Sequence, residues 1–584
     1  MGAAAEVLIA FESATDVWTD LSDDVMIGEG VSISFGIAGD KPLDMVAGTG
    51  QCTFTLRGFK YSFHHADVLA GWAFGARIRV TCYRTTDTAQ SVSSITRSTA
   101  TATVTTASAH GYSNDDWITI AGASQGDYNG VFQIVYDSDT MSATTFTYDL
   151  GSLTPSTPAS GTITARLGYV RHNGRLRAAN PTAGAYGTRY VAVVSYDGIR
   201  ALAETNVRAV AIQEDQTETE LLTALLDSLP SDAQPLARDF DSGVDTYPYA
   251  FDALGGGKTA LSVVKDIAVS GFAMVYMEGT GTLCLRTRDT RASGASKFSF
   301  DDDMTALVTN ASVDELTNNV QCTIYPRTVD AAATTVIYST TGVPLSVAAG
   351  DTLTLVVEYR SPDDDRELIG GTAVVTPLVA TTDYLGYSTV SGTGGSDLTS
   401  DLAIVTTASA SSAKLAITNN GTATIYLVDS SGDAKLEIRG KGIYQESAQT
   451  FTSLSTQPYG DKTLSINLPY QNSPVNAQSY ASTVQQQFNA AAAAQMEQIV
   501  FDGNSSDDLL QQAFARNPND IISVTETATG ASSIEMVIQS VALDISTGPW
   551  IEATFGLAPS SPFSQWLLGI DGRTELGETT ILGW

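Results

Sequence analysis

Residues 259–288 predict a helix that runs directly into a two-stranded hairpin. Thr259 suits the N-cap of this helix, and Gly271 is expected to end it. Residues 272–277 and 282–288 are β-prone runs, and the glycines between them suit a short hairpin loop. Such a unit is too small to bury its own apolar face, so the remainder of the chain must supply a larger scaffold. The apolar stripe of the helix is formed by Leu261, Val264, Ile267 and Ala268.

The scaffold is predicted to be mainly β. A chain of 584 residues is too long for one hydrophobic core, which favours several domains. Only 16% of the residues are charged, 50 are glycine, and Thr, Ser and Val are frequent, a composition that favours strands and turns over helices. We therefore expect a multi-domain α+β protein, mainly β with a few helices.

The charge balance excludes some partners. The chain has 31 Lys and Arg against 64 Asp and Glu, a formal net charge of −33. Sequence-specific binding of nucleic acids needs clustered cations, and anionic membranes repel such a chain. No apolar run reaches membrane-spanning length, so we expect no membrane insertion. The acidity favours a soluble surface, and a second interpretation is a negative channel wall that DNA slides past.

No catalytic, cofactor-binding or metal residues are assigned, and we predict that the chain is not an enzyme. The cysteines show no C-x-x-C pair and are expected to be buried free thiols. The histidines accompany neither a G-x-S-x-G nor an H-E-x-x-H motif. With 64 acidic residues, chance carboxylate pairs give no support to glycoside hydrolysis. The residues concerned are Cys52, Cys82, Cys284, Cys322, His64, His65, His110 and His172.

Three polar segments resemble ligand sites, and for each a structural role is the stronger interpretation. Residues 363–367 form an acidic run that predicts a solvated turn, with a calcium loop as the minor alternative. Residues 502–508 alternate like an EF-hand loop, yet Asp507 stands where glycine is required, so we predict a turn that caps a helix over 507–515. Residues 255–259 suggest a phosphate loop, but Asp252 occupies a required glycine position.

Two further features, both in the first half of the chain, resemble ligand sites but are better explained by a structural role. His110 is expected to be a turn histidine, because no second ligand stands at metal-binding spacing. Tyr112, Trp117 and Tyr128 offer a sugar-stacking surface, although packing in the core and turns is the favoured interpretation.

Strand-like alternation divides the chain into units. Strands at 78–83 and 165–171 would be neighbours if the segment between them were an insertion. Further strands are predicted at 168–175, 189–196 and 206–212, and a capping box at Thr217 begins a leucine-rich helix. The later half predicts strands that include 372–379, a helix over 476–494, and strands at 521–525, 533–544 and 550–557.

These patterns give six predicted regions. They are a discontinuous first barrel at 1–84 and 166–215, an inserted small β-module at 85–165, a helix-plus-hairpin domain at 216–309, an inserted β-sandwich at 310–440, a second barrel-like α+β domain at 441–557 and a C-terminal extension at 558–584.

Six short motifs are spread over most of the chain. They are W-T-D-L-S-D-D-V at 18–25, G-T-G-Q-C-T-F-T-L at 48–56, the helix and strand from Ala260 to Arg286 or Arg288, Y-G-D-K-T-L at 459–464, N-P-N-D-I-I-S-V at 517–524 and the W-L-L-G ending from Trp566. Taken together, these motifs resemble those of tail hub and minor tail proteins of long-tailed, siphovirus-like and actinophage-like bacteriophages.

The resemblance implies a structural role at a phage tail tip. A hub of this kind, similar to the baseplate central hub family, closes the tail tube, adapts its symmetry, links it to host-recognition proteins and leaves a lumen for DNA passage. It implies a homotrimer that contacts a distal tail ring or tail tube protein, a tape measure protein and receptor-binding or fibre proteins. It also implies a virion location at the tail tip, after assembly in the host cytoplasm.

Two alternatives belong to other classes. One is a receptor- or carbohydrate-binding tail protein with its specificity on the inserted β-modules. The other is a tail-associated hydrolase, which would need a carboxylate pair or zinc set that the sequence does not display. A distal tail ring protein uses similar barrels as a hexamer, so the sequence leaves trimer and hexamer both open.

Overall fold

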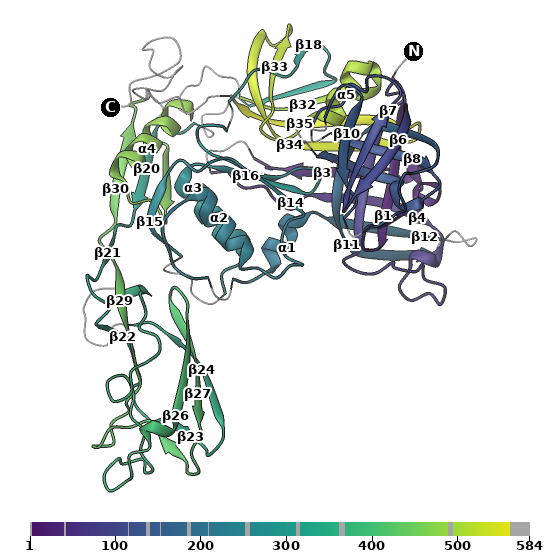
Figure 1. Ribbon diagram of the computed structural model, residues 1–584. Helices are drawn as coiled ribbons and strands as arrows, with labels where there is room; N and C mark the ends of the chain where they lie inside the picture. Colours follow the sequence, from purple (N-terminus) through teal and green to yellow (C-terminus); the bar gives the residue numbers. More distant parts are fainter. Residues whose placement is uncertain are drawn as a thin grey trace.

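The computed structural model describes residues 3–560 except 40–42, 115, 136–140, 152, 184–188, 208–209, 252–256, 292, 311–315, 361–367, 459 and 489–494. Within these ranges the chain is mostly β-strand with five α-helices, which confirms the predicted mainly β fold class. Figure 1 shows several sheets and a module that extends away from the others.

The N-terminal sheet is antiparallel in the order β2–β1–β5–β11–β12–β4–β3. Its strands are β1 (Ala5–Ala14), β2 (Val17–Asp20), β3 (Val31–Gly36), β4 (Gln51–Arg57), β5 (Arg77–Arg84), β11 (Gly161–Ala183) and β12 (Arg189–Tyr196). Alternate side chains point inward, as in β4, where Cys52, Phe54 and Leu56 are buried. β5 pairs with β11, so the predicted neighbours on either side of the insertion are confirmed.

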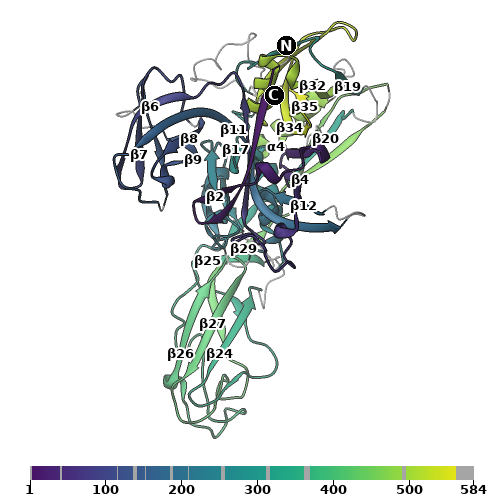
Figure 2. The same cartoon turned by 90° about the vertical axis from the view of Figure 1, so that its right-hand side faces the viewer.

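The inserted segment forms a closed barrel with its own core, which includes Ile95, Val104 and Phe146. Its strands are β6 (Gln90–Ser98), β7 (Thr101–Thr106), β8 (Trp117–Ala123), β9 (Gly130–Val135), β10 (Thr145–Asp149) and the start of β11. Pairing runs β6–β7–β10–β9–β8–β11 and returns to β6. β11 has 23 residues, so one strand belongs first to this barrel and then to the N-terminal sheet, as Figure 2 shows.

The C-terminal sheet is fused to the N-terminal one. Its elements are β18 (Ser299–Asp301), β19 (Ala306–Asn310), β32 (Gln495–Asp502), helix α5 (Asp507–Ala515), β33 (Ile521–Glu526), β34 (Ala531–Ser546) and β35 (Trp550–Pro559). One edge of β34 pairs with β35, while its other edge pairs first with β33 and then with β3, from Ser540↔Gly36 to Ile545↔Val31. The two sheets consequently share one hydrophobic core.

A second core combines helices and small sheets from distant parts of the chain. Its helices are α1 (Gly198–Glu204), α2 (Glu218–Asp227), α3 (Ala260–Gly271) and α4 (Pro474–Phe488). Its strands are β13 (Gln213–Thr217), β14 (Ala237–Phe240), β15 (Thr246–Ala250), β16 (Met274–Met277), β17 (Thr282–Arg286), β20 (Asn319–Ile324), β30 (Gln449–Leu454) and β31 (Thr463–Leu468). Buried residues from 199–285 and from 320–488 contribute to one cluster.

A distal module completes the chain. Its strands are β21 (Arg327–Val329), β22 (Thr335–Ser339), β23 (Ser346–Val347), β24 (Thr352–Glu358), β25 (Leu368–Thr372), β26 (Leu402–Ala408), β27 (Ser412–Asn419), β28 (Ile425–Tyr426) and β29 (Glu437–Gln445). The sheet β24–β27–β26 and the sheet around β29 share a core that includes Ile337, Leu415 and Ile438. Figures 1 and 2 both show this module projecting from the rest of the molecule.

The local predictions have mixed outcomes. The helix after Thr259, the capping box at Thr217, the helix over 507–515 and the strands of the hairpin are confirmed. The strand predicted at 206–212 is wrong for its described residues, which exclude 208–209. Asn206 makes an isolated bridge with Thr259, and Val207 and Val210 pack into the second core. Helix α1 was not predicted.

The predicted strand at 372–379 is also wrong, because β25 ends at Thr372. Ala373 has a left-handed φ of 47°, and Pro377 lacks the N–H that a ladder needs. The acidic run at 363–367, the glycines at 255–256, the alanines at 490–494 and the ending from Trp566 lie outside the described residues.

Candidate functional site

The β16–β17 hairpin lies at the junction of the second core and the fused sheets. Thr259 caps α3 by accepting a hydrogen bond from Ser262 N. The helix ends at Gly271, where an added Cβ would lie 2.8 Å from the Tyr247 hydroxyl. The left-handed residue that follows is Phe272, with φ of 52°, rather than the glycine. The chain then enters β16, which pairs with β17.

The loop of this hairpin docks on β11. Asn173 donates from Nδ2 to Thr280 O at 2.9 Å. A Cβ at Gly279 would lie 2.6 Å from Arg171 O, so a side chain there would prevent this approach. Gly281 supplies the left-handed turn with φ of 87°. The hairpin is therefore positioned by the strand that also belongs to the inserted barrel.

Arg171 joins the N-terminal sheet to the loop before β33. The register of β11 against β5 shifts at Arg171, so this residue is the extra member of a β-bulge that redirects its side chain. The side chain lies over the Phe35 ring, 4.9 Å from its centroid, and donates to Arg516 O at 2.7 Å and Asn517 Oδ1 at 3.1 Å. Burial lowers the pKa of Arg171 to about 10, which keeps it charged at neutral pH.

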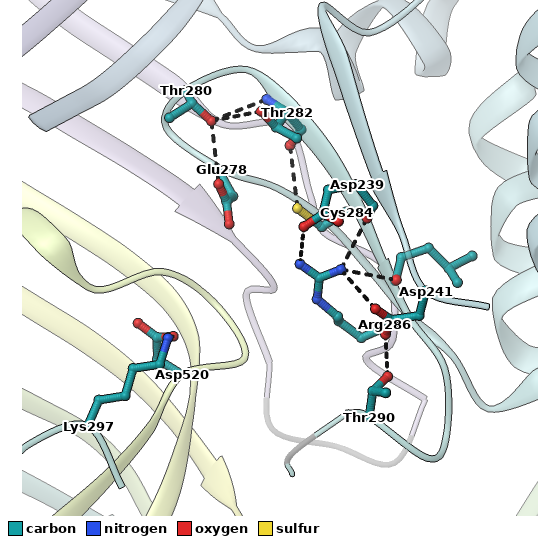
Figure 3. Close-up of polar contacts among 11 residues, drawn as sticks. Asp239, Asp241, Glu278, Thr280, Thr282, Cys284, Arg286, Thr290, Lys297 and Asp520 are labelled. Carbon is teal, nitrogen blue, oxygen red and sulfur yellow. Dashed lines mark hydrogen bonds and ion pairs between the residues drawn. The ribbon is translucent and has the colours of Figure 1, made fainter. Parts of the chain in front are cut away.

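Charged groups flank the hairpin on both sides (Figure 3). Arg286 of β17 lies 2.5 Å from Asp239 Oδ2 and 3.3 Å from Asp241 Oδ1. Lys297 Nζ lies 2.5 Å from Asp520 Oδ1 in the same view. Burial raises the pKa of Glu278, at the end of β16, above its ordinary value. The Arg286 pairs join β17 to β14 and to Asp241 just after it, whereas the Lys297 pair joins the segment before β18 to the loop before β33.

A second polar network is centred on Asp245, which is 5% exposed. Its carboxylate lies 2.6 Å from Arg288 Nη1 and accepts hydrogen bonds from the Tyr480 hydroxyl, from Gln471 Nε2 at 3.1 Å and from Asn476 Nδ2 at 3.0 Å. Arg288 follows β17, whereas Tyr480 and Asn476 belong to α4. The network therefore joins the two chain segments that build the second core.

The buried pair His172 and Ser195 is the arrangement most similar to a catalytic one. His172 Nε2 lies 2.8 Å from Ser195 Oγ. Both side chains are buried, at 3% and 0% exposure, and burial lowers the pKa of His172 to about 3. A substrate has no access to this serine, so the contact stabilises the sheet and does not create a nucleophile.

The other candidates from the sequence are dispersed. His110 Nδ1 accepts from Tyr112 N at 2.9 Å and Nε2 lies 3.0 Å from Ser142 O, which agrees with the predicted turn histidine. Tyr128 is fully buried, whereas His64 and His65 are exposed. The four cysteines are buried and free, as expected. In the segment 502–508, which alternates like an EF-hand loop, Asn504 donates from Nδ2 to Ala3 O and to Pro549 O, and Ser506 caps α5.

Across the described ranges, no group of three or more His, Cys, Asp or Glu side chains is placed to hold a metal ion. None of the helices in that part of the chain is long and apolar enough to cross a membrane.

Arg171 and Asp245 were missed by sequence analysis. The partner of Arg171 at Arg516 lies 345 residues away, and Tyr480 lies 235 residues from Asp245. No local spacing signals such contacts. The one available signal was Arg288, which stands at a motif position of the tail hub resemblance.

No protein-family model and no curated protein matches the chain. In structure it is similar to a 43 kDa tail protein of prophage MuSo2 from Shewanella oneidensis, with 8% identity over 95% of this chain and 99% of that one and a TM-score of 0.42. A tail protein from Neisseria meningitidis MC58 shows 7% identity over 95% and 96% of the two chains and a TM-score of 0.43.

An E. coli component of the type VI secretion system, described as similar to T4 bacteriophage tail proteins gp27 and gp5, shows 7% identity over 96% of this chain and 76% of that one, with a TM-score of 0.33. At these levels of similarity, the roles of these proteins do not transfer to this chain.

Proposed function

We propose that this chain is a non-enzymatic structural component of a phage tail tip, a hub that closes the tail tube, adapts its symmetry and links it to host-recognition proteins. The observation that carries the proposal is the pairing of β3 with β34, which fuses the N-terminal and C-terminal sheets around one core. The tail hub motifs at 18–25, 48–56 and 517–524 lie in or beside this fused unit.

The fused unit supports a role in matching symmetries. A subunit that carries two sheet units in fixed relation can fill two adjacent positions of a six-fold ring, so three copies complete it. Arg171 and the six-residue register of β3 on β34 fix the relation between the two units. Function in this account is geometric and needs no catalytic residue.

An open sheet edge supports self-association. Among the described residues, β19 pairs only with β32, and its Ala-Leu-Val-Thr run carries no charge. Val308 of this strand is 41% exposed. An uncharged, unprotected edge strand is a liability in a monomer and is usually covered by another chain.

The acidity agrees with DNA passage. A net charge of −33 gives a ring of three copies a strongly negative character, and a negative wall repels the phosphate backbone. We propose a distal ring or tube protein, a tape measure protein and receptor-binding proteins as neighbours at the virion tail tip.

The edge strand gives the test. We expect the purified protein to have the mass of a trimer and Val308→Lys to shift it toward monomer, because a lysine on an edge strand opposes pairing. Val343→Lys is the matched control, since Val343 is 85% exposed on the distal module and lies outside its strands. Mass photometry measures both. A wild-type monomer, or equal effects of the two variants, would overturn the role proposed for β19.

A second candidate function is receptor or carbohydrate binding by the distal module. The observation that favours it is the projection of this module from the rest of the molecule (Figures 1 and 2). The outer face of its β24–β27–β26 sheet carries exposed Val356 and Val405. Loss of adsorption to the host with retention of assembled tails, after removal of this module, would favour this function.

A further inference from the structure

A depression of about 290 Å³ opens between β11, α1 and the loop after α2. Three arginines line it, Arg175 and Arg177 from β11 and Arg200 from α1. A smaller cavity of about 20 Å³ adjoins it, shares Arg175 and Asp232 with it and adds Arg77. The chain has twice as many acidic as basic residues, so this gathering of arginines runs against its composition.

The local fold directs these side chains to one place. The register of β11 against β12 shifts at Arg177, which makes this residue the extra member of a second β-bulge. Bulges redirect side chains and are frequent beside binding sites. Arg200 follows from α1, with its guanidinium 5.5 Å from the centroid of the Tyr196 ring.

The arginines are not fully neutralised. Arg177 Nη2 and Arg200 Nε lie 2.5 Å and 2.8 Å from the same atom, Glu204 Oε1. Arg175 contacts Gly75 O at 3.4 Å and, among the described residues, has no carboxylate within ion-pair distance. Asp232 is exposed at the rim. Two carboxylates therefore face three guanidinium groups.

Asp197 adds little negative charge. It lines the depression but is 7% exposed, and its Oδ2 has no hydrogen-bond partner in the described part of the chain. Burial raises the pKa of Asp197 to about 7, so it is partly protonated near neutral pH. The depression keeps a local positive balance on a protein that is otherwise strongly negative.

We propose that this depression binds a carboxylate side chain presented by an acidic segment of another protein chain, with Arg175 as the principal donor. A planar guanidinium can bind a carboxylate in bidentate geometry, and one oxygen of Glu204 already accepts from both Arg177 and Arg200 in the depression. The volume admits one or two side chains and not a nucleic-acid duplex. The site is independent of the proposed tail role.

The probe is a fluorescein-labelled hexaglutamate peptide, with binding to the full chain followed by fluorescence anisotropy at low salt. We expect Arg175→Gln to weaken binding by about tenfold or more, because it removes the guanidinium that has no carboxylate partner among the described residues. We expect Glu204→Gln to strengthen binding, because it removes the carboxylate that competes for Arg177 and Arg200. Opposite effects of these two changes are not expected from a general loss of structure.

The matched control is Arg57→Gln, which makes the same change of charge on an exposed arginine. Arg57 pairs with Tyr190, whereas Tyr196 at the depression pairs with Gln51, so the two places lie about 20 Å apart along β12. Circular dichroism melting curves establish that each variant is folded. Equal weakening by Arg57→Gln and Arg175→Gln, or no effect of Arg175→Gln, overturns the proposal.

Two further arms identify the ligand. Tighter binding of a single-stranded oligonucleotide than of the peptide, lost in Arg175→Gln, would assign the site to phosphates and overturn the carboxylate proposal. Sedimentation velocity separates the sources of the acidic segment. If Arg175→Gln lowers self-association, the segment belongs to a second copy of this chain, and if it lowers only peptide binding, the segment belongs to a different protein.

Discussion

Asp245 shows how single residues hold this protein together. Its carboxylate takes a guanidinium, a phenol and two amides from segments that are far apart in the chain. Removal of one partner from such a buried network leaves the others uncompensated. The free energy lost on such a change therefore reflects weaker packing between the two chain segments that build the second core, and not the loss of a single contact.

We expect Asp245→Asn to lower the local free energy of unfolding of α3 and α4 by about 3 kcal/mol, because buried Arg288 loses the carboxylate at 2.6 Å and keeps Asp289 at 3.9 Å. Hydrogen exchange of amides in these helices measures this effect. Asp127→Asn, an exposed change in the inserted barrel, is the control and should leave them unaffected. Unchanged protection of α3 and α4 in Asp245→Asn would contradict the structural role of the network.

His172 gives a prediction for acid conditions. Burial lowers its pKa to about 3 in the folded chain, against an ordinary value of 6.5. Below the unfolded pKa the unfolded state binds a proton that the folded state does not bind, so stability falls as pH falls from about 6.5 toward 3.

We expect His172→Gln to reduce the loss of unfolding free energy between about pH 7 and about pH 4.5 by roughly 2–3 kcal/mol. The comparison is of slopes, so a constant destabilisation by the substitution does not affect it. Urea denaturation at each pH measures it. Identical pH dependence in the two proteins would show that His172 is not a buried neutral group.

At the scale of single residues, the sequence predicts only those contacts whose two partners lie close together in the chain. The caps at Thr217 and Thr259 could be predicted because donor and acceptor lie three residues apart. Arg171 could not, because a bulge changes the face on which its side chain emerges and its partners lie in a distant loop. A period-two pattern contains no sign of a bulge.

At the scale of elements, β11 connects the inserted barrel to the N-terminal sheet without a flexible linker. Its first residues close the barrel by pairing with β6 and β8, and its later residues pair with β5 and β12. The orientation of the barrel is therefore set by one continuous strand.

We expect a fragment of residues 88–168 to fold alone, because it contains all six strands of the closed barrel and a separate core. A fragment of residues 88–160 should not fold, since it lacks the closing segment of β11. Amide dispersion in two-dimensional NMR spectra distinguishes them. Equal dispersion in both fragments would contradict the closing role of β11.

Element prediction succeeded where one pattern dominated. α5 has the predicted bounds because Ser506 and the following stripe of apolar residues give a start and a buried face. The prediction of a strand at 206–212 failed because its valines pack into the second core without pairing in a sheet. Hydropathy alone does not distinguish a buried strand from a buried irregular segment. α1 was missed because only seven residues separate its cap at Asp197 from its end.

At the scale of the whole molecule, segments distant in sequence are interleaved. β3 pairs with β34 across roughly five hundred residues, and the second core takes residues from both sides of the distal module. Sequence patterns suggested strands in each region but contained no information on which sheets would fuse. The six proposed regions therefore stay a proposal, because the first and second hydrophobic cores each take residues from more than one of these regions.

The proposed function requires this chain to form a ring at a phage tail tip. The measurement that tests it most directly is the number of copies of the chain, and their position, in purified intact particles by cryo-electron microscopy. We expect three copies in one closed ring at the tail tip. A stable monomer that is absent from particles, or copies distributed along fibres, would contradict it.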